Sequence, residues 1–151
     1  MAQDEAKLTQ RLVGALYTEA MVLADEARAY FDRFGREERD GLDPMTRVGF
    51  SCESLKVTTR LMHIIAWLLT QRAVEAGELS VAQARRPSRR LGDEPESDEA
   101  VLAKLPEAAR ALVTSSRDLF ARCRRLDEVG PEVEAHPSPA RSLLNRLERS
   151  L

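Results

Sequence analysis

The most constraining feature of the sequence is a run of nine residues, Leu61–Leu69, in which His63 alone is not apolar. Polar residues flank it, with Arg60 before it and Thr70 after it. A membrane-spanning helix needs roughly 20 apolar residues, so this run is too short to cross a bilayer. It is typical of the most buried helix of a small bundle, covered on more than one side.

Length and composition agree with a single helical domain. A chain of 151 residues is long enough to bury its own core. With 32% charged residues and a formal net charge of -2, it lacks the basic surplus of a nucleic-acid binder. Cys52 and Cys123 are isolated, which favours reduced thiols over a disulfide or zinc framework. The acidic, polar start predicts no signal peptide, so we expect a cytoplasmic protein.

Two long helices are predicted in the first half of the chain. The first covers about residues 4–34 and ends at Gly35, where we expect a left-handed residue and then a polar turn. Asp43 and Pro44 give the second helix a capping carboxylate and a proline at its first position. It continues to about residue 76, where Gly77 ends it. Long helices joined by a short turn form an antiparallel hairpin. The apolar face of the first helix comprises Leu8, Leu12, Leu16, Ala20, Leu23, Ala27, Tyr30 and Phe34.

The second half of the chain predicts a third long helix. Ser80 and Gln83 fit a capping box that opens a short helix, and residues 87–98 are predicted to be a mobile loop. Pro106 either starts the third helix or kinks one that begins near residue 99. We expect the helix to end by Gly130. Its predicted packing positions follow a heptad spacing: Ala109, Leu112, Ser116, Leu119, Cys123 and Leu126.

The predicted fold is therefore all-α: an up-down three-helix bundle with long antiparallel helices, a short extra helix and a C-terminal amphipathic segment. We assign residues 1–130 to the bundle and 131–151 to a linker and tail. Leu143, Leu144 and Leu147 form a narrow apolar stripe in the tail. The tail could dock on the bundle, bind a partner, or fray, because isolated short helices are marginal in water.

The second helix carries more apolar surface than one neighbouring helix can cover. Its two adjoining apolar stripes together span about 200° of the helical wheel. A three-helix bundle could bury both, and a dimer interface could equally bury the second. The first stripe comprises Leu55, Met62, Ala66, Leu69 and Ala73. The second stripe, a core or dimer face, comprises Val57, Leu61, Ile64, Ile65 and Leu68.

The remaining face of the second helix is a polar ridge that contains the only tryptophan. A tryptophan between arginine and glutamine has the composition of a protein-binding hot spot. The alternative is that Trp67 covers the short helix that begins near Ser80. The candidates for partner docking are Lys56, Arg60, His63, Trp67, Gln71 and Arg72.

Catalytic motifs are missing from the sequence. There is no glycine-rich phosphate loop, no H-E-x-x-H motif, no paired metal ligands and no nucleophile elbow. His63 could in principle accept a phosphoryl group, but it lies within LMHIIAW, without the lysine and glycine companions of such sites. We therefore expect no enzyme, no metal and no cofactor.

Three segments resemble the regulator of CtrA degradation (RcdA-like) family of alphaproteobacteria. They are REERDGLDP at 36–44, TTRLMHIIAWLLTQRAVEAGELSVAQAR at 58–85, and RDLFARCRRLD at 117–127. The likeness covers roughly residues 16–127 and is densest from Thr58 to Arg85. The individual words are short, so the specificity comes from their order and spacing.

The resemblance implies a three-helix bundle that forms a homodimer and has no catalytic activity. Such proteins act as adaptors that help bring cell-cycle regulators to the ClpXP protease, together with a response regulator. The expected partners are thus a protease unfoldase, a response regulator and a substrate regulator. The alternative from the residues is a structural or regulatory bundle that contacts DNA or a membrane surface through its basic C-terminal segment.

Overall fold

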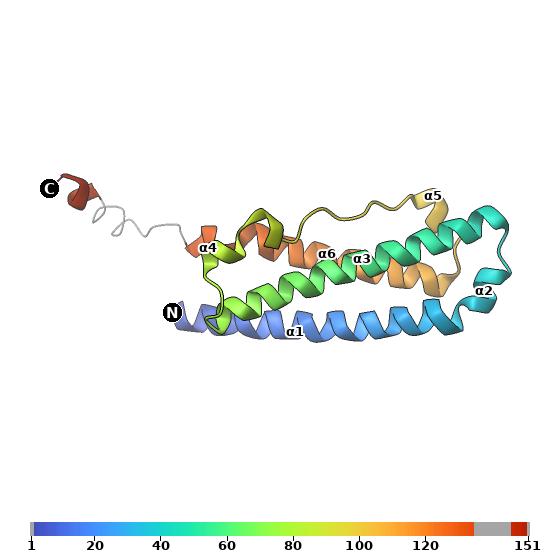
Figure 1. Ribbon diagram of the computed structural model, residues 1–151, viewed down its shortest axis with the longest axis horizontal. Helices are drawn as coiled ribbons and strands as arrows, with labels where there is room; N and C mark the ends of the chain where they lie inside the picture. The colour runs from blue at the N-terminus through green and yellow to red at the C-terminus, as the bar shows by residue number, and fades with distance from the viewer. Residues whose placement is uncertain (1, 135–145, 151) are drawn as a thin grey trace.

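Three long helices lie side by side in the computed structural model, which describes residues 2–134 and 146–150. They are α1 (Ala2–Ala29), α3 (Pro44–Glu75) and α6 (Glu107–Glu134) (Figure 1). The all-α class and the three-helix bundle predicted from the sequence are confirmed. In the described residues no helix is both long enough and apolar enough to cross a bilayer.

The direction of the third helix differs from the predicted alternation. α1 and α3 form the expected antiparallel hairpin, but α6 runs parallel to α3 (Figure 1). Arg60 contacts Ser116 and Trp67 contacts Asp127, so the two helices advance together. The reason is the extended segment at 90–98, which carries the chain back along α3 toward the N-terminal end of that helix before α6 begins. Nine extended residues reach about 30 Å, which corresponds to about 20 residues of helix.

Helix starts follow local side-chain chemistry, as predicted. The Asp43 carboxylate accepts the Thr46 backbone N–H at 3.1 Å, and Pro44 occupies the first turn of α3. The Thr46 hydroxyl also donates to this carboxylate, and the hydroxyl and the N–H together lower the pKa of Asp43. Ser80 and Gln83 form both bonds of a capping box at α4 (Val81–Ala84).

The end of the first helix departs from the prediction at Gly35. Residues 30–34 form a π-helical turn, η1 (Tyr30–Phe34), and Gly35 has a φ of −83°, not a left-handed value. Glycine is needed for space here, because a Cβ atom would lie 2.8 Å from the Tyr30 carbonyl oxygen. The expected polar turn contains a short helix, α2 (Arg36–Asp40).

The second half of the chain contains two further short helices. After the turn η2 (Pro87–Arg89), the chain is extended until α5 (Glu99–Leu102). Pro106 follows α5 and immediately precedes α6, so it marks a helix start and not a kink. α6 continues to Glu134, which corrects the predicted end at Gly130. A proline near a helix terminus removes one hydrogen bond and need not stop the helix.

The core lies between the three long helices. Leu16, Ala20, Leu23 and Ala27 of α1 are buried, whereas Leu8, Leu12 and Phe34 of the predicted apolar face are exposed. The heptad positions of α6 are buried as predicted, with Leu126 half-buried. Val113 and Phe120 are also buried on α6. On the outside, Arg122 of α6 forms an ion pair with Glu19 of α1.

Candidate protein-docking surfaces

Arg60, predicted to lie on an exposed ridge, is fully buried. Its side chain has 0% relative exposure and lies between α3, α6 and the extended segment 90–98, which we call the strap. Its guanidinium donates to the Glu94 carboxylate at 3.2 Å and to the Ser97 hydroxyl at 2.7 Å. It also donates to the Pro95 carbonyl at 3.0 Å. These bonds fix the strap to the middle of α3.

A second buried charge completes this clamp. Glu53 is buried on the same helix, about two turns before Arg60. Its carboxylate accepts a hydrogen bond from the Ser97 hydroxyl at 2.7 Å and forms an ion pair with Lys56 at 3.2 Å. Burial lowers the pKa of the Arg60 guanidinium, while Glu94 and Glu53 oppose that shift. An arginine stays charged in such a setting, so the clamp is an ionic network.

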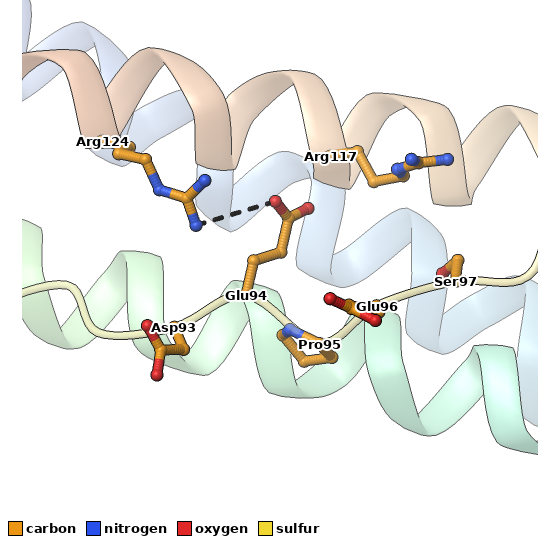
Figure 2. A pocket seen from close by; sticks show the side chains of 7 residues that line it. All are labelled: Asp93, Glu94, Pro95, Glu96, Ser97, Arg117 and Arg124. Atoms are coloured by element: carbon orange, nitrogen blue, oxygen red, sulfur yellow. Dashed lines mark ion pairs between the residues drawn. The ribbon is translucent and has the colours of Figure 1, made fainter.

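An open groove of about 560 Å³ lies where the strap passes α6. It is bounded by Arg117 and Arg124 on α6 and by residues 93–97 of the strap. Figure 2 shows Glu94 pointing from the strap toward Arg124, with 3.9 Å between their charged atoms. Arg117 pairs instead with Glu99, at 2.8 Å. The arginines are thus engaged by the chain's own carboxylates.

Trp67 is also covered by the chain itself. Its indole N–H donates to the Asp127 carboxylate at 3.1 Å, and the residue is 4% exposed. Arg90 pairs with the same carboxylate at 3.1 Å, and Arg85 donates to the Asp127 carbonyl at 2.6 Å. Asp127 therefore holds the segment after α4 at a second point. Trp67 therefore bonds to α6, at the point where Arg85 and Arg90 bind the same aspartate.

The predicted ridge is consequently not one accessible surface. Arg60 and Trp67 face the interior, so docking of a partner on them would require the strap to move. His63 and Arg72 are exposed, and the Arg72 guanidinium lies 4.9 Å from the centre of the Tyr17 ring. The remaining ridge candidates, Lys56 and Gln71, are half-buried.

The strap is a structural element that the sequence did not predict. We expected residues 87–98 to be a mobile loop, but Leu91 lies in the hydrophobic core and Glu94 and Ser97 bind Arg60. The available signal was Leu91 itself, an isolated apolar residue among charges and prolines. The division of the chain at residue 130 stays a prediction.

The second apolar stripe of α3 is core. Val57, Ile64 and Leu68 are fully buried and Leu61 nearly so, while Ile65 is half-buried. This stripe is therefore not free to form a dimer face. In the tail, Leu147 is 57% exposed, and Leu143 and Leu144 lie outside the described residues.

The first apolar stripe of α3 is left bare. Leu55 is 68% exposed, Met62 64% and Leu69 48%, and Ala66 is exposed as well. Apolar surface gathered along one helix commonly marks a protein-binding site. This stripe is the best candidate docking surface in the described part of the chain.

No metal-binding cluster is found in residues 2–134 or 146–150. No three histidine, cysteine or acidic side chains are placed there to hold a metal ion. Cys123 is buried in the core, where burial raises its thiol pKa to about 11. A thiol with so high a pKa is a poor nucleophile at neutral pH.

The fold and these surfaces define an all-α three-helix bundle with a long exposed apolar helix face. The chain belongs to the family described as "Protein of unknown function (DUF1465)", whose model matches residues 4–151.

The bundle also resembles a solved structure described as RcdA from Caulobacter crescentus CB15. The two share 33% sequence identity with a TM-score of 0.62, over 77% of this chain and 88% of that chain. The resemblance found in the sequence is thereby confirmed. No curated protein matches the sequence.

Proposed function

We propose that this protein is a non-catalytic adaptor in the regulated proteolysis of cell-cycle regulators, linked to the ClpXP protease. The observation that carries the proposal is the likeness to RcdA, at 33% identity over 77% of the chain. The exposed apolar face of α3 supports it, because an adaptor acts by binding several proteins and needs surface for them.

The proposed partners are a protease unfoldase, a response regulator and the substrate regulator, all in the cytoplasm, with a second copy of the chain as a fourth. Of the ridge, the exposed His63 and Arg72 are the residues that can meet a partner without moving the strap. Leu147 in the tail is a further contact candidate, since it is exposed.

The test is a reconstituted degradation reaction. It contains ClpXP, ATP, a cell-cycle regulator as substrate and a response regulator, with and without the full-length protein. We expect the protein to raise the rate at which the substrate disappears while it is not consumed itself. An unchanged rate at every protein concentration overturns the adaptor proposal.

A matched pair of variants tests the ridge. Arg72 of α3 and Arg110 of α6 are both exposed arginines, on different helices. If the ridge binds a partner, Arg72→Asp reduces the acceleration and Arg110→Asp does not. If both variants accelerate degradation like the wild type, Arg72 has no part in docking.

A further inference from the structure

The outer face of α3 has a regular sequence pattern that its exposure alone does not explain. Apolar or small uncharged residues recur along it at steps of four and three through eight positions. We call these positions the α3 seam: Val48, Cys52, Leu55, Thr59, Met62, Ala66, Leu69 and Ala73. Such spacing is the heptad pattern of helices that pack lengthwise against another helix. The seam extends for about 38 Å at 1.5 Å per residue.

The seam points away from the core of its own bundle. Its four large residues are 48–68% exposed, and Cys52 and Ala66 are exposed too. Thr59 and Ala73 are half-buried. In the described part of the chain, no other element therefore occupies this face.

Polar chemistry is excluded from the seam. The six charged residues of α3 all lie at other positions of the helix. The Thr59 hydroxyl donates to the Leu55 carbonyl of its own helix at 2.9 Å, which leaves its methyl group to face outward. Exposing an uncharged apolar face over seven helical turns to water is unfavourable. Such a face is suited to packing against the apolar face of a second helix.

Large and small residues alternate along the seam. Val48, Leu55, Met62 and Leu69 are the large members, and a small residue stands between each pair of them. Helices interdigitate when large side chains of one meet small side chains of the other. The pattern therefore selects a partner helix with the same alternation in the opposite order.

We propose that the partner is a second copy of this chain, whose α3 packs antiparallel against the first along the seam. A two-fold axis between residues 60 and 61 places position i of one copy beside position 121 − i of the other. Every layer then joins a large residue to a small one: Val48 to Ala73, Leu55 to Ala66, Leu69 to Cys52, and Met62 to Thr59. Two-fold symmetry requires such self-complementarity, because each contact occurs twice with exchanged roles.

A parallel pair does not have this property. In a parallel, in-register pair each residue meets its own copy, so large residues meet large ones and small residues meet small ones. The layers would alternate between crowded and empty, and both are unfavourable in packed interfaces. The alternation thus selects the antiparallel arrangement.

This inference deepens the proposed function by placing its homodimer on a defined face and register, and on that point it rests on the proposed function. It does not depend on the link to proteolysis. The two can fail separately, because one is tested by degradation and the other by cross-linking and mass.

One substitution tests the register with the native thiol. In Leu69→Cys the new thiol of one copy lies beside Cys52 of the other, so oxidation should join two chains. Within one chain the two positions are 17 residues apart on one helix, about 25 Å. A disulfide needs Cα atoms within about 7 Å, so no bond can form inside one chain.

Two controls make this test specific. The wild type places its two Cys52 thiols about 25 Å apart in the antiparallel pair and should stay uncross-linked. Leu69→Cys combined with Cys52→Ser keeps the same loss of a leucine but removes the partner thiol, and it leaves the two new thiols about 25 Å apart in the antiparallel pair. We expect covalent dimers to be at least tenfold more abundant for Leu69→Cys than for either control under mild copper-phenanthroline oxidation.

Each outcome decides the proposal. Cross-linking of the wild type would show a parallel pair and overturn the register. Equal cross-linking of Leu69→Cys with and without Cys52→Ser would show random collision and overturn it as well. Light scattering across a concentration series, with Ala66→Glu as the disrupted variant, gives an independent reading. We expect the wild type to approach the dimer mass and the variant to remain a monomer; a wild type that stays monomeric, or a variant dimer as tight as the wild type, overturns the seam.

Discussion

The clamp at Arg60 gives the sharpest test of what holds the bundle in this topology. The substitution Arg60→Met keeps an unbranched chain of similar length and removes the charge. It deletes the bonds to Glu94, Pro95 and Ser97 together. Because the guanidinium has 0% exposure, water cannot take over these bonds without rearrangement of the strap.

The size of the stability loss depends on which cations still pair with Glu53 and Glu94 once the Arg60 guanidinium is removed. Removing one partner of a buried ion pair costs about 3–5 kcal/mol, because the other charge is left uncompensated. Here Glu53 keeps Lys56 at 3.2 Å and Glu94 keeps Arg124 at 3.9 Å. Since both carboxylates still have a cation, the lower end applies, and we expect a loss of about 3 kcal/mol. For a chain of this size, that lowers the melting temperature by roughly 6–12 °C.

The assay is urea unfolding followed by circular dichroism at the helical band, at pH 7. Arg117→Met is the matched control, since Arg117 pairs with Glu99 on the surface, where both side chains are substantially exposed. An exposed pair contributes about 0–1 kcal/mol, so this control should lose less than 1 kcal/mol. Cleavage after Glu96 by a glutamate-specific protease should be faster in Arg60→Met only, because the strap must leave α3 to enter the protease.

A loss below about 1 kcal/mol for Arg60→Met would refute the clamp. A large loss without faster cleavage of the strap would refute it in another way, because the cost would then come from the core. The companion change Glu94→Gln in the Arg60→Met background should restore part of the lost stability, since it removes a charge that has lost its nearest partner.

Further predictions concern the core, one close approach and one thiol. Leu68→Ala, at a fully buried position, should lose about 2–5 kcal/mol in urea unfolding, whereas the same change at the exposed Leu8 of α1 should lose about 1 kcal/mol or less. Gly35→Ala brings a Cβ within 2.8 Å of a backbone carbonyl and should destabilise by about 1–3 kcal/mol; Gly14→Ala, with nothing within 4 Å, should stabilise by about 0.5–1 kcal/mol, and thermal melts of both variants would show the opposite signs. Burial raises the pKa of Cys123 from 9.0 to about 11, so the folded state holds a proton that the unfolded state loses in this window. The free energy of unfolding should therefore fall between pH 9 and pH 11 more steeply for the wild type than for Cys123→Ala, and equal slopes would contradict the burial effect.

Features determined by neighbouring residues were predictable from the sequence. The caps at Asp43 and Ser80 depend on atoms three residues away, and both were found as expected. The heptad positions of α6 were equally clear, because helical periodicity alone reports which face is buried. For the second stripe of α3, the sequence allowed two assignments, core or dimer face, and could not distinguish between them.

Features determined by distant segments were not predictable in this way. A helical wheel placed Arg60 and Trp67 on a polar ridge, yet it contains no information about a non-helical segment that covers that ridge. The strap reverses the expected direction of α6, and only contacts between residues 34 to 60 positions apart reveal it. Gly35 was correctly found as a helix end, but its reason is close packing on Tyr30 and not a left-handed backbone.

The bond between Trp67 and Asp127 has a practical consequence. Trp67 is the only tryptophan in the chain, so all of its indole emission comes from the point where α3, α6 and the segment after α4 meet. The wavelength of maximum emission should remain short while the Asp127 carboxylate binds both the indole and Arg90. It should shift to longer wavelength when water reaches the ring. The fluorescence of Trp67 thus reports whether the start of the strap at Arg90 is bound to α6. It can be followed during partner binding without any added label.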